Sequence, residues 1–150
     1  MVFLVDRVPL VYQQSEYIRS QVPKLRVMML VGEMESSQQK AVHQALANQE
    51  VDVLVLTHQI FLNFLAIEKN PIVRLSDISV LVFDEAHHCR GRHQYNQIMD
   101  YYHVTANKFK PIVLGVGVLG CSSERKEHGG SDKTSDGDQQ AKIAVRRFWM

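Results

Sequence analysis

The sequence has few of the features that mark secreted, membrane-spanning or strongly charged proteins. Its two cysteines, Cys89 and Cys121, are too few for a disulfide framework, and no segment resembles a secretory signal. All apolar runs are shorter than the roughly 20 residues of a membrane-spanning helix. Lysine and arginine (17) nearly balance aspartate and glutamate (16). We therefore expect a soluble, intracellular protein, cytoplasmic or nuclear, whose contacts with any nucleic acid are local.

The apolar residues suffice for one folded domain and follow an alternating pattern. Hydrophobic residues make up 45% of the 150 residues and charged residues 22%, as in ordinary globular proteins. The expected strands are residues 2–5, 25–31, 51–56, 78–83 and 111–114. The first expected helix begins at Pro9, and the second is capped by Ser36 or Ser37 and ends at Asn48. The third begins at Thr57 or His58 and ends at Asn70-Pro71, and the fourth runs from Tyr95 to Tyr102. Buried strands separated by helices predict an α/β fold with a mostly parallel sheet covered on both faces.

The composition changes near residue 120. From Cys121 to Gln140 the chain is rich in serine, glutamate, lysine, glycine and aspartate without periodicity, a composition that buries too little apolar surface to fold. We predict a domain over residues 1–120 and a disordered tail over residues 121–150.

An acidic pair, Asp84-Glu85, directly follows the apolar run Val80–Phe83. Ligands of open parallel sheets bind outside the carboxyl ends of the strands, so this position is a candidate for chemistry. In nucleoside triphosphatases the aspartate of such a pair holds magnesium, and the neighbouring carboxylate orients the attacking water. The sequence therefore predicts a magnesium-dependent hydrolytic site here.

Three segments in the same order resemble motifs of superfamily 2 helicases of the Dicer-like kind. They are Phe3–Gln14 with its Val-Pro-Leu-x-x-Gln-Gln helix start, Val53–Ile60 with Thr-His-Gln, and Ile78–His88 with Asp-Glu-Ala-His-His. The resemblance covers roughly residues 1–115. It implies the first RecA-like lobe of a P-loop NTPase, a three-layer α/β fold that works with ATP, Mg²⁺, a second RecA-like lobe and double-stranded RNA.

The resemblance also implies roles for individual residues. Asp84 would hold Mg²⁺ through water, Glu85 would activate the attacking water, and His87 would sense the other lobe. The residues implied along the RNA backbone are Val8, Pro9, Gln13, Gly32, Thr57 and His58, although Gln13, Thr57 and His58 are equally types that cap helices and form turns.

The sequence departs from the family pattern in two places. It contains no Gly-x-x-x-x-Gly-Lys-Ser/Thr phosphate loop (Walker A), and its beginning inside a strand suggests truncation before the Walker A strand. The motif after the 111–114 strand, normally Thr/Ser-Ala-Ser/Thr, is Gly117-Val118-Leu119. We therefore expect a helicase fragment that hydrolyses ATP negligibly by itself.

Two other classes of function stay open. One is a non-catalytic RNA-binding or scaffold fragment that has kept the fold without the motor. The other is a metal-dependent hydrolase, because imidazole, thiolate and carboxylate all suit zinc. Its ligands would come from Asp84, His87, His88, Cys89 and His93.

Overall fold

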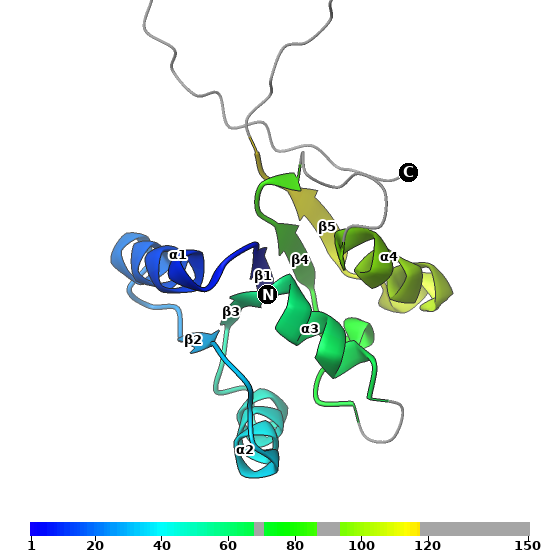
Figure 1. Cartoon of the computed structure of the whole chain (residues 1–150), viewed down its shortest axis with the longest axis horizontal. Coiled ribbons are helices and arrows are strands. Elements are labelled where there is room, and N and C mark those ends of the chain that lie inside the picture. The colour runs from blue at the N-terminus through cyan, green and yellow to red at the C-terminus, as the bar shows by residue number, and fades with distance from the viewer. Residues whose placement is uncertain (68–70, 87–93, 118–150) are drawn as a thin grey trace, which may run out of the picture.

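The computed structural model describes residues 1–67, 71–86 and 94–117, in which strands and helices alternate (Figure 1). The strands are β1 (Val2–Val5), β2 (Val27–Leu30), β3 (Val53–Thr57), β4 (Val80–Phe83) and β5 (Ile112–Gly115). The helices are α1 (Val8–Gln21), α2 (Ser36–Ala47), α3 (His58–Leu65) and α4 (Gln94–Val104), with short 3-10 turns at Leu75–Asp77 and Asn107–Phe109. The predicted tail over residues 121–150 lies outside the described residues.

The five strands form one parallel sheet in the order β2-β3-β1-β4-β5. The central strand β1 pairs on one side with β3, where Val5 lies opposite Thr57, and on the other with β4, where Leu4 lies opposite Phe83. Because the order has no gap, a further strand could pair only along the outer edge of β2 or β5. The predicted parallel α/β sheet is confirmed.

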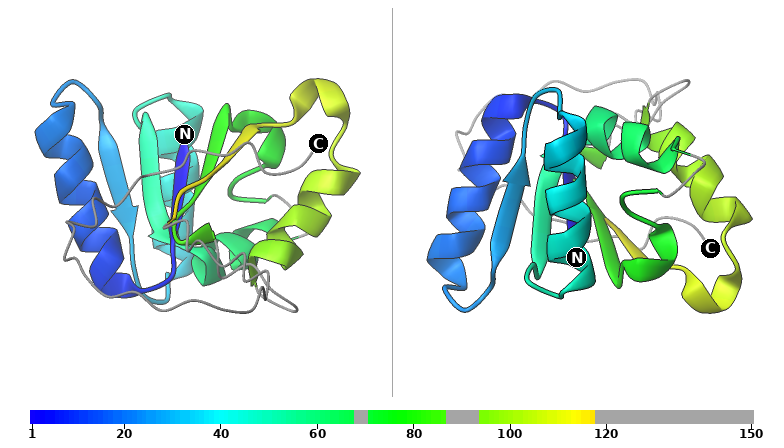
Figure 2. Two further views of the ribbon diagram at one scale, coloured as in Figure 1. Left: turned by 90° about the horizontal axis from the view of Figure 1, so that it is seen from above. Right: turned by 90° about the horizontal axis from the view of Figure 1, so that it is seen from below.

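Helices cover the sheet on both faces, which makes three layers (Figures 1 and 2). The connection after the central strand β1 leads to the edge strand β2. The later connections, from β2 to β3, β4 and β5, run across the sheet in the opposite direction. Since crossovers between parallel strands are right-handed, this reversal sends α1 to one face and α2, α3 and α4 to the other. Val11 of α1 packs on Val5, Val53 and Val55. The larger cluster on the opposite face includes Leu4, Leu56, Phe61, Leu81, Phe83, Tyr95 and Ile98.

Several predicted element boundaries were wrong by a few residues. The cap of α2 is Glu35, not Ser36 or Ser37: its carboxylate accepts from the backbone of Gln38, whose side chain accepts from the Glu35 N–H at 2.9 Å. Helix α3 ends at Leu65, before Asn70-Pro71, and β4 begins at Val80 because a 3-10 turn precedes it.

Within the described ranges, no helix is long and apolar enough to cross a membrane.

An ion pair fixes the edge strand β2 to β3 at their amino ends. One Asp52 carboxylate oxygen accepts from the backbone N–H of Arg26 and from its Nε, both at 2.9 Å, and the other accepts from Nη2 at 2.8 Å. These hydrogen bonds hold the pKa of the Asp52 carboxyl well below its usual range. The geometry is bidentate, which distinguishes it from ordinary surface ion pairs.

We predict that this pair makes folding stability depend on pH in the acidic range. A carboxyl with a lowered folded-state pKa stabilises the fold above its unfolded pKa, about 4, and this contribution is lost as the pH falls through the lower folded-state value. Asp52→Asn should therefore flatten the acid limb of urea-unfolding free energy plotted against pH. Asp77→Asn, at an exposed carboxylate that accepts from the neighbouring Ser76 hydroxyl at 3.1 Å, is the matched control. An unchanged acid limb in Asp52→Asn would contradict the assignment.

Candidate functional site

The acidic pair lies where the direction of the strand connections reverses. The connection after β1 leads through α1 towards β2, whereas the connection after the neighbouring β4 leads through α4 towards β5. In open parallel sheets such a switch point leaves a crevice at the carboxyl ends of the strands, and ligands bind there. Asp6 follows β1 and Asp84 follows β4, so both carboxylates lie at this crevice.

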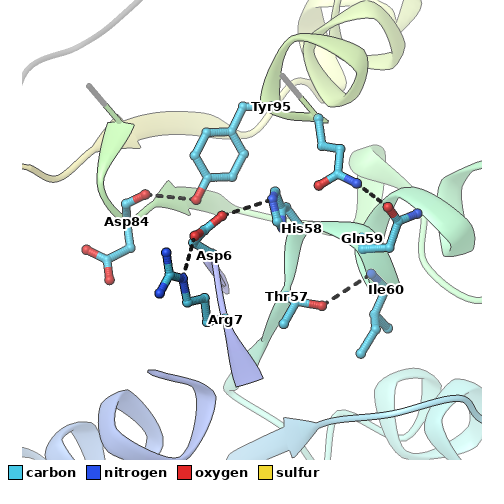
Figure 3. Close-up of polar contacts among 9 residues, drawn as sticks. Asp6, Arg7, Thr57, His58, Gln59, Ile60, Asp84 and Tyr95 are labelled. Carbon is cyan, nitrogen blue, oxygen red and sulfur yellow. Dashed lines mark hydrogen bonds and ion pairs between the residues drawn. The ribbon is translucent and has the colours of Figure 1, made fainter. Parts of the chain in front are cut away.

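Asp84 is held by its backbone, and its carboxylate is half-buried. Its N–H donates to the carbonyl of Leu4 at 2.9 Å, and its own carbonyl accepts from the Tyr95 hydroxyl at 2.8 Å. The carboxylate accepts the N–H of Glu85 at 3.1 Å and points away from Tyr95 (Figure 3). Burial raises the pKa of Asp84 above its ordinary value, against the opposing effect of that hydrogen bond. The backbone of Asp84 is thus fixed, and its half-buried carboxylate lies at the carboxyl end of β4.

Glu85 has a left-handed backbone, with φ of +50°. A residue with a Cβ pays about 1 kcal/mol or more in this region, and such strain gathers at functional sites. The next residue, Ala86, donates its N–H to the carbonyl of Val116 at 2.8 Å, which ties the turn to the end of β5. The turn after β4 is therefore strained at the residue predicted to activate water.

A cluster of aromatic and polar side chains links the turn after β4 to the start of α3. The Tyr95 ring packs edge-on against Phe83 and against His58, with centroids 4.7 and 5.2 Å apart. His58 Nε2 lies 3.4 Å from a carboxylate oxygen of Asp6, whose other oxygen lies 3.3 Å from Nε of Arg7 (Figure 3). Residues that end β1, begin α3 and follow β4 are thereby joined.

A groove of about 550 Å³ lies beside this crevice, at the carboxyl ends of β2 and β3. Its lining includes three residues that the sequence predicted along RNA, Val8, Gly32 and Thr57. Gly32 has φ of +76°, a conformation that favours glycine, and open space surrounds the position of a Cβ. The Thr57 hydroxyl caps α3 by accepting the N–H of Ile60 at 3.5 Å.

Side-chain amides make up much of the polar surface of this groove. Gln59 donates to Asn63 at 2.9 Å and accepts from Gln94 of α4 (Figure 3 shows the latter contact). Both ends of the Gln59 amide are therefore fixed, and α4 helps to orient a residue of the groove. The full lining is Val8, Gly32, Glu33, Met34, Gln39, Thr57, Gln59, Ile60, Asn63 and Phe64.

The other predicted site residues lie elsewhere. Pro9 and Gln13 are exposed on α1 without lining the groove. His58 is buried against Asp6 and Tyr95, so its side chain faces the crevice after β1 and β4. His87 falls outside the described residues. The RNA and catalytic roles of all these residues stay predictions.

Four residues that the structure places at these sites were not predicted as site residues from the sequence. Asp6 follows a buried strand as Asp84 does, so the same argument could have found it. Tyr95 was predicted only as helical, and Gln59 and Asn63 only as part of a helix. Nothing local in the sequence marks their contacts, because the partners lie on other elements.

The zinc hypothesis rests on residues that the structure mostly leaves undescribed. Among residues 1–67, 71–86 and 94–117, no three histidine, cysteine, aspartate or glutamate side chains gather as metal ligands do. His87, His88, Cys89 and His93 lie outside these ranges, so the proposed zinc cluster remains untested.

Comparison with known proteins gives one consistent family. The family model described as DEAD/DEAH box helicase matches residues 1–115. Protein Dicer of Schizosaccharomyces pombe is 43% identical over 105 residues, which is 68% of this chain and 7% of that protein. Endoribonuclease Dicer homolog 1 of Arabidopsis thaliana is 37% identical over 82% of this chain and 6% of its own length.

A solved structure agrees with the sequence relatives. The helicase domain of Pyrococcus furiosus Hef superimposes with a TM-score of 0.59 at 31% identity, over 77% of this chain and 23% of that one. The chain thus spans less than a tenth of the Dicer relatives named above and about a quarter of the Hef domain. With its parallel sheet and an Asp-Glu-Ala-His run that begins at Asp84, directly after β4, the chain belongs to the DEAD/DEAH box helicase family.

Proposed function

We propose that this chain is the part of a Dicer-like helicase motor that holds the magnesium and water of an ATP site and contacts RNA at the neighbouring groove. The observation that carries the proposal is the position of Asp84 and Glu85 at the strand switch point, next to the groove lined by Val8, Gly32 and Thr57. The similarity to Dicer proteins supports double-stranded RNA processing as the activity to which such a motor contributes.

The two acidic residues suit different tasks at the ATP site. Carboxylate oxygens are preferred magnesium ligands, and the half-buried Asp84 is held by hydrogen bonds from its own N–H to Leu4 and from Tyr95 to its carbonyl. Glu85, on the strained turn, would orient the attacking water. When bound, the magnesium ion neutralises charge that develops on the phosphoryl oxygens.

The residues present fit the metal better than they fit the nucleotide. In P-loop enzymes a glycine-rich loop and its lysine hold the phosphates, and the 150 residues contain no such motif. We therefore propose that this chain alone turns ATP over negligibly and that a second RecA-like lobe and a phosphate loop complete the site.

The groove offers the hydrogen-bonding chemistry that a nucleic-acid backbone needs. Helix α3 starts at its wall with Thr57 as cap, and helix amino termini and hydroxyls suit phosphate oxygens. Gly32 keeps the wall open, since no other atom lies within 4 Å of the position of a Cβ. A non-catalytic RNA-binding role would use this groove alone, and it predicts RNA binding without stabilisation by Mg²⁺, whereas the motor role predicts both.

Asp84→Asn is expected to stabilise the fold while it removes the magnesium site. Asparagine keeps an oxygen that accepts the Glu85 N–H but lacks the charge that burial disfavours. A carboxyl with a raised folded-state pKa destabilises the fold as the pH rises through that value. The variant should therefore unfold at a higher urea concentration than wild type at neutral pH, and the two midpoints should converge at acidic pH. Added Mg²⁺ should raise the melting temperature of wild type only. Asp100→Asn on α4, an exposed site, is the control; equal stabilisation there would contradict the interpretation.

Steady-state phosphate release tests the predicted inactivity of the isolated chain. We expect no turnover above background with ATP and Mg²⁺, with or without double-stranded RNA, because nothing in the sequence replaces the phosphate loop. RNA-stimulated turnover that Glu85→Gln abolishes would overturn this view and would assign a complete ATP site to the chain.

Val8→Glu tests the groove. Val8 is 41% exposed in the first turn of α1, where an acidic residue suits the helix dipole, so the fold should tolerate the change. A carboxylate in the groove should repel phosphates, and we expect RNA affinity in filter binding to fall about tenfold, a loss of about 1.4 kcal/mol. Gln21→Glu makes the same charge change at the far end of α1 and should bind as wild type does. Equal affinities of all three proteins would remove the groove from the RNA site.

A further inference from the structure

The groove has almost no charge with which to attract phosphates. Of its ten lining residues only Glu33 is charged, and Glu33 is acidic. Its other polar side chains are those of Gln39, Thr57, Gln59 and Asn63. Since counterion release by lysine and arginine supplies most non-specific affinity for nucleic acids, a strand bound here needs another favourable contact.

One flank of α1 supplies an exposed aromatic ring next to the groove. At 3.6 residues per turn, Tyr12 lies about 40° and Arg19 about 20° around the helix from Val8, so the three share a flank. Val8 lines the groove, and Arg19 donates to the carbonyl of Val27 on the edge strand β2 at 2.8 Å. This flank therefore faces the β2 edge, with Tyr12 one turn beyond the groove and 48% exposed.

The edge strand continues the same apolar surface. Val27 and Val31 pack in the core cluster on the α1 face, so Met29 between them points to that face as well. Met29 is 38% exposed and Val8 is 41% exposed. We call Val8, Tyr12 and Met29 the stacking flank. It adjoins the groove at Val8 and at Gly32, which follows β2 by two residues.

We propose that the stacking flank receives an unpaired base of a strand lying in the groove, with Tyr12 as the residue that stacks on it. This inference rests on the proposed RNA contact and makes it more specific. Base–aromatic stacking contributes affinity without cations, which the uncharged lining requires. An A-form duplex keeps its base faces inside the stack, so Tyr12 favours single-stranded or splayed nucleotides over a continuous duplex.

Fluorescence anisotropy with the 150-residue chain and three labelled RNAs tests the proposal. The RNAs are an oligoadenylate, an abasic ribose-phosphate oligomer of equal length, and a blunt duplex. Tyr12→Ala should weaken oligoadenylate binding about tenfold, and Tyr12→Phe should restore it because the ring is retained. Binding of the abasic oligomer should not change in either variant. The wild-type affinity for oligoadenylate should fall only shallowly with added salt.

Tyr17→Ala is the matched control. Tyr17 lies on the opposite flank of the same helix and is 61% exposed, so its loss should leave oligoadenylate binding unchanged. Wild-type binding that Tyr12→Ala does not weaken, or a preference for the duplex over oligoadenylate, overturns the stacking role and leaves the groove as an RNA site. Failure of wild type to bind any of the three RNAs overturns the proposed RNA contact and the inference together. Melting curves of both alanine variants establish that each is folded.

Discussion

The site depends on the parallel pairing of β1 with two partners at once. The carbonyl of Leu4 accepts the N–H of Asp84, while Val5 lies opposite Thr57 on the other side. Because all five strands run in the same direction, their carboxyl ends meet at one edge of the sheet. Residues 6, 57 and 84 are far apart in the chain and become neighbours through this pairing alone.

The surroundings of Asp84 lower the stability of the turn after β4. Burial disfavours its charged form, and the neighbouring Glu85 occupies a strained backbone conformation. Contacts from elsewhere hold this turn in place: the hydroxyl of Tyr95 on the Asp84 carbonyl and the carbonyl of Val116 on Ala86. A buried aromatic packed against Phe83 is well suited to this task, because its position is fixed by the core.

The ATP and RNA regions of the proposed site share structural elements. His58 begins α3 directly after Thr57 of the groove, and its ring packs on the Tyr95 that holds Asp84. Gln94 of α4 contacts Gln59 of the groove lining, and the same helix carries Tyr95. Packed side chains thus connect the start of α3 with the turn that carries the acidic pair.

The sequence by itself determined the class of fold, the succession of strands and helices along the chain, the acidic pair and the family. Each of these follows from local signals: apolar runs, helix starts such as Pro9, and the Asp-Glu-Ala-His run. Only the tertiary structure decided that Val8, Gly32 and Thr57 share a groove, that His58 turns towards Asp6, and that Tyr95 holds Asp84. The physical reason is that the order of the strands in the sheet and the packing of the helices on it bring these residues together. Periodicity reports which face of an element is buried and carries no information about which residue of another element lies against it.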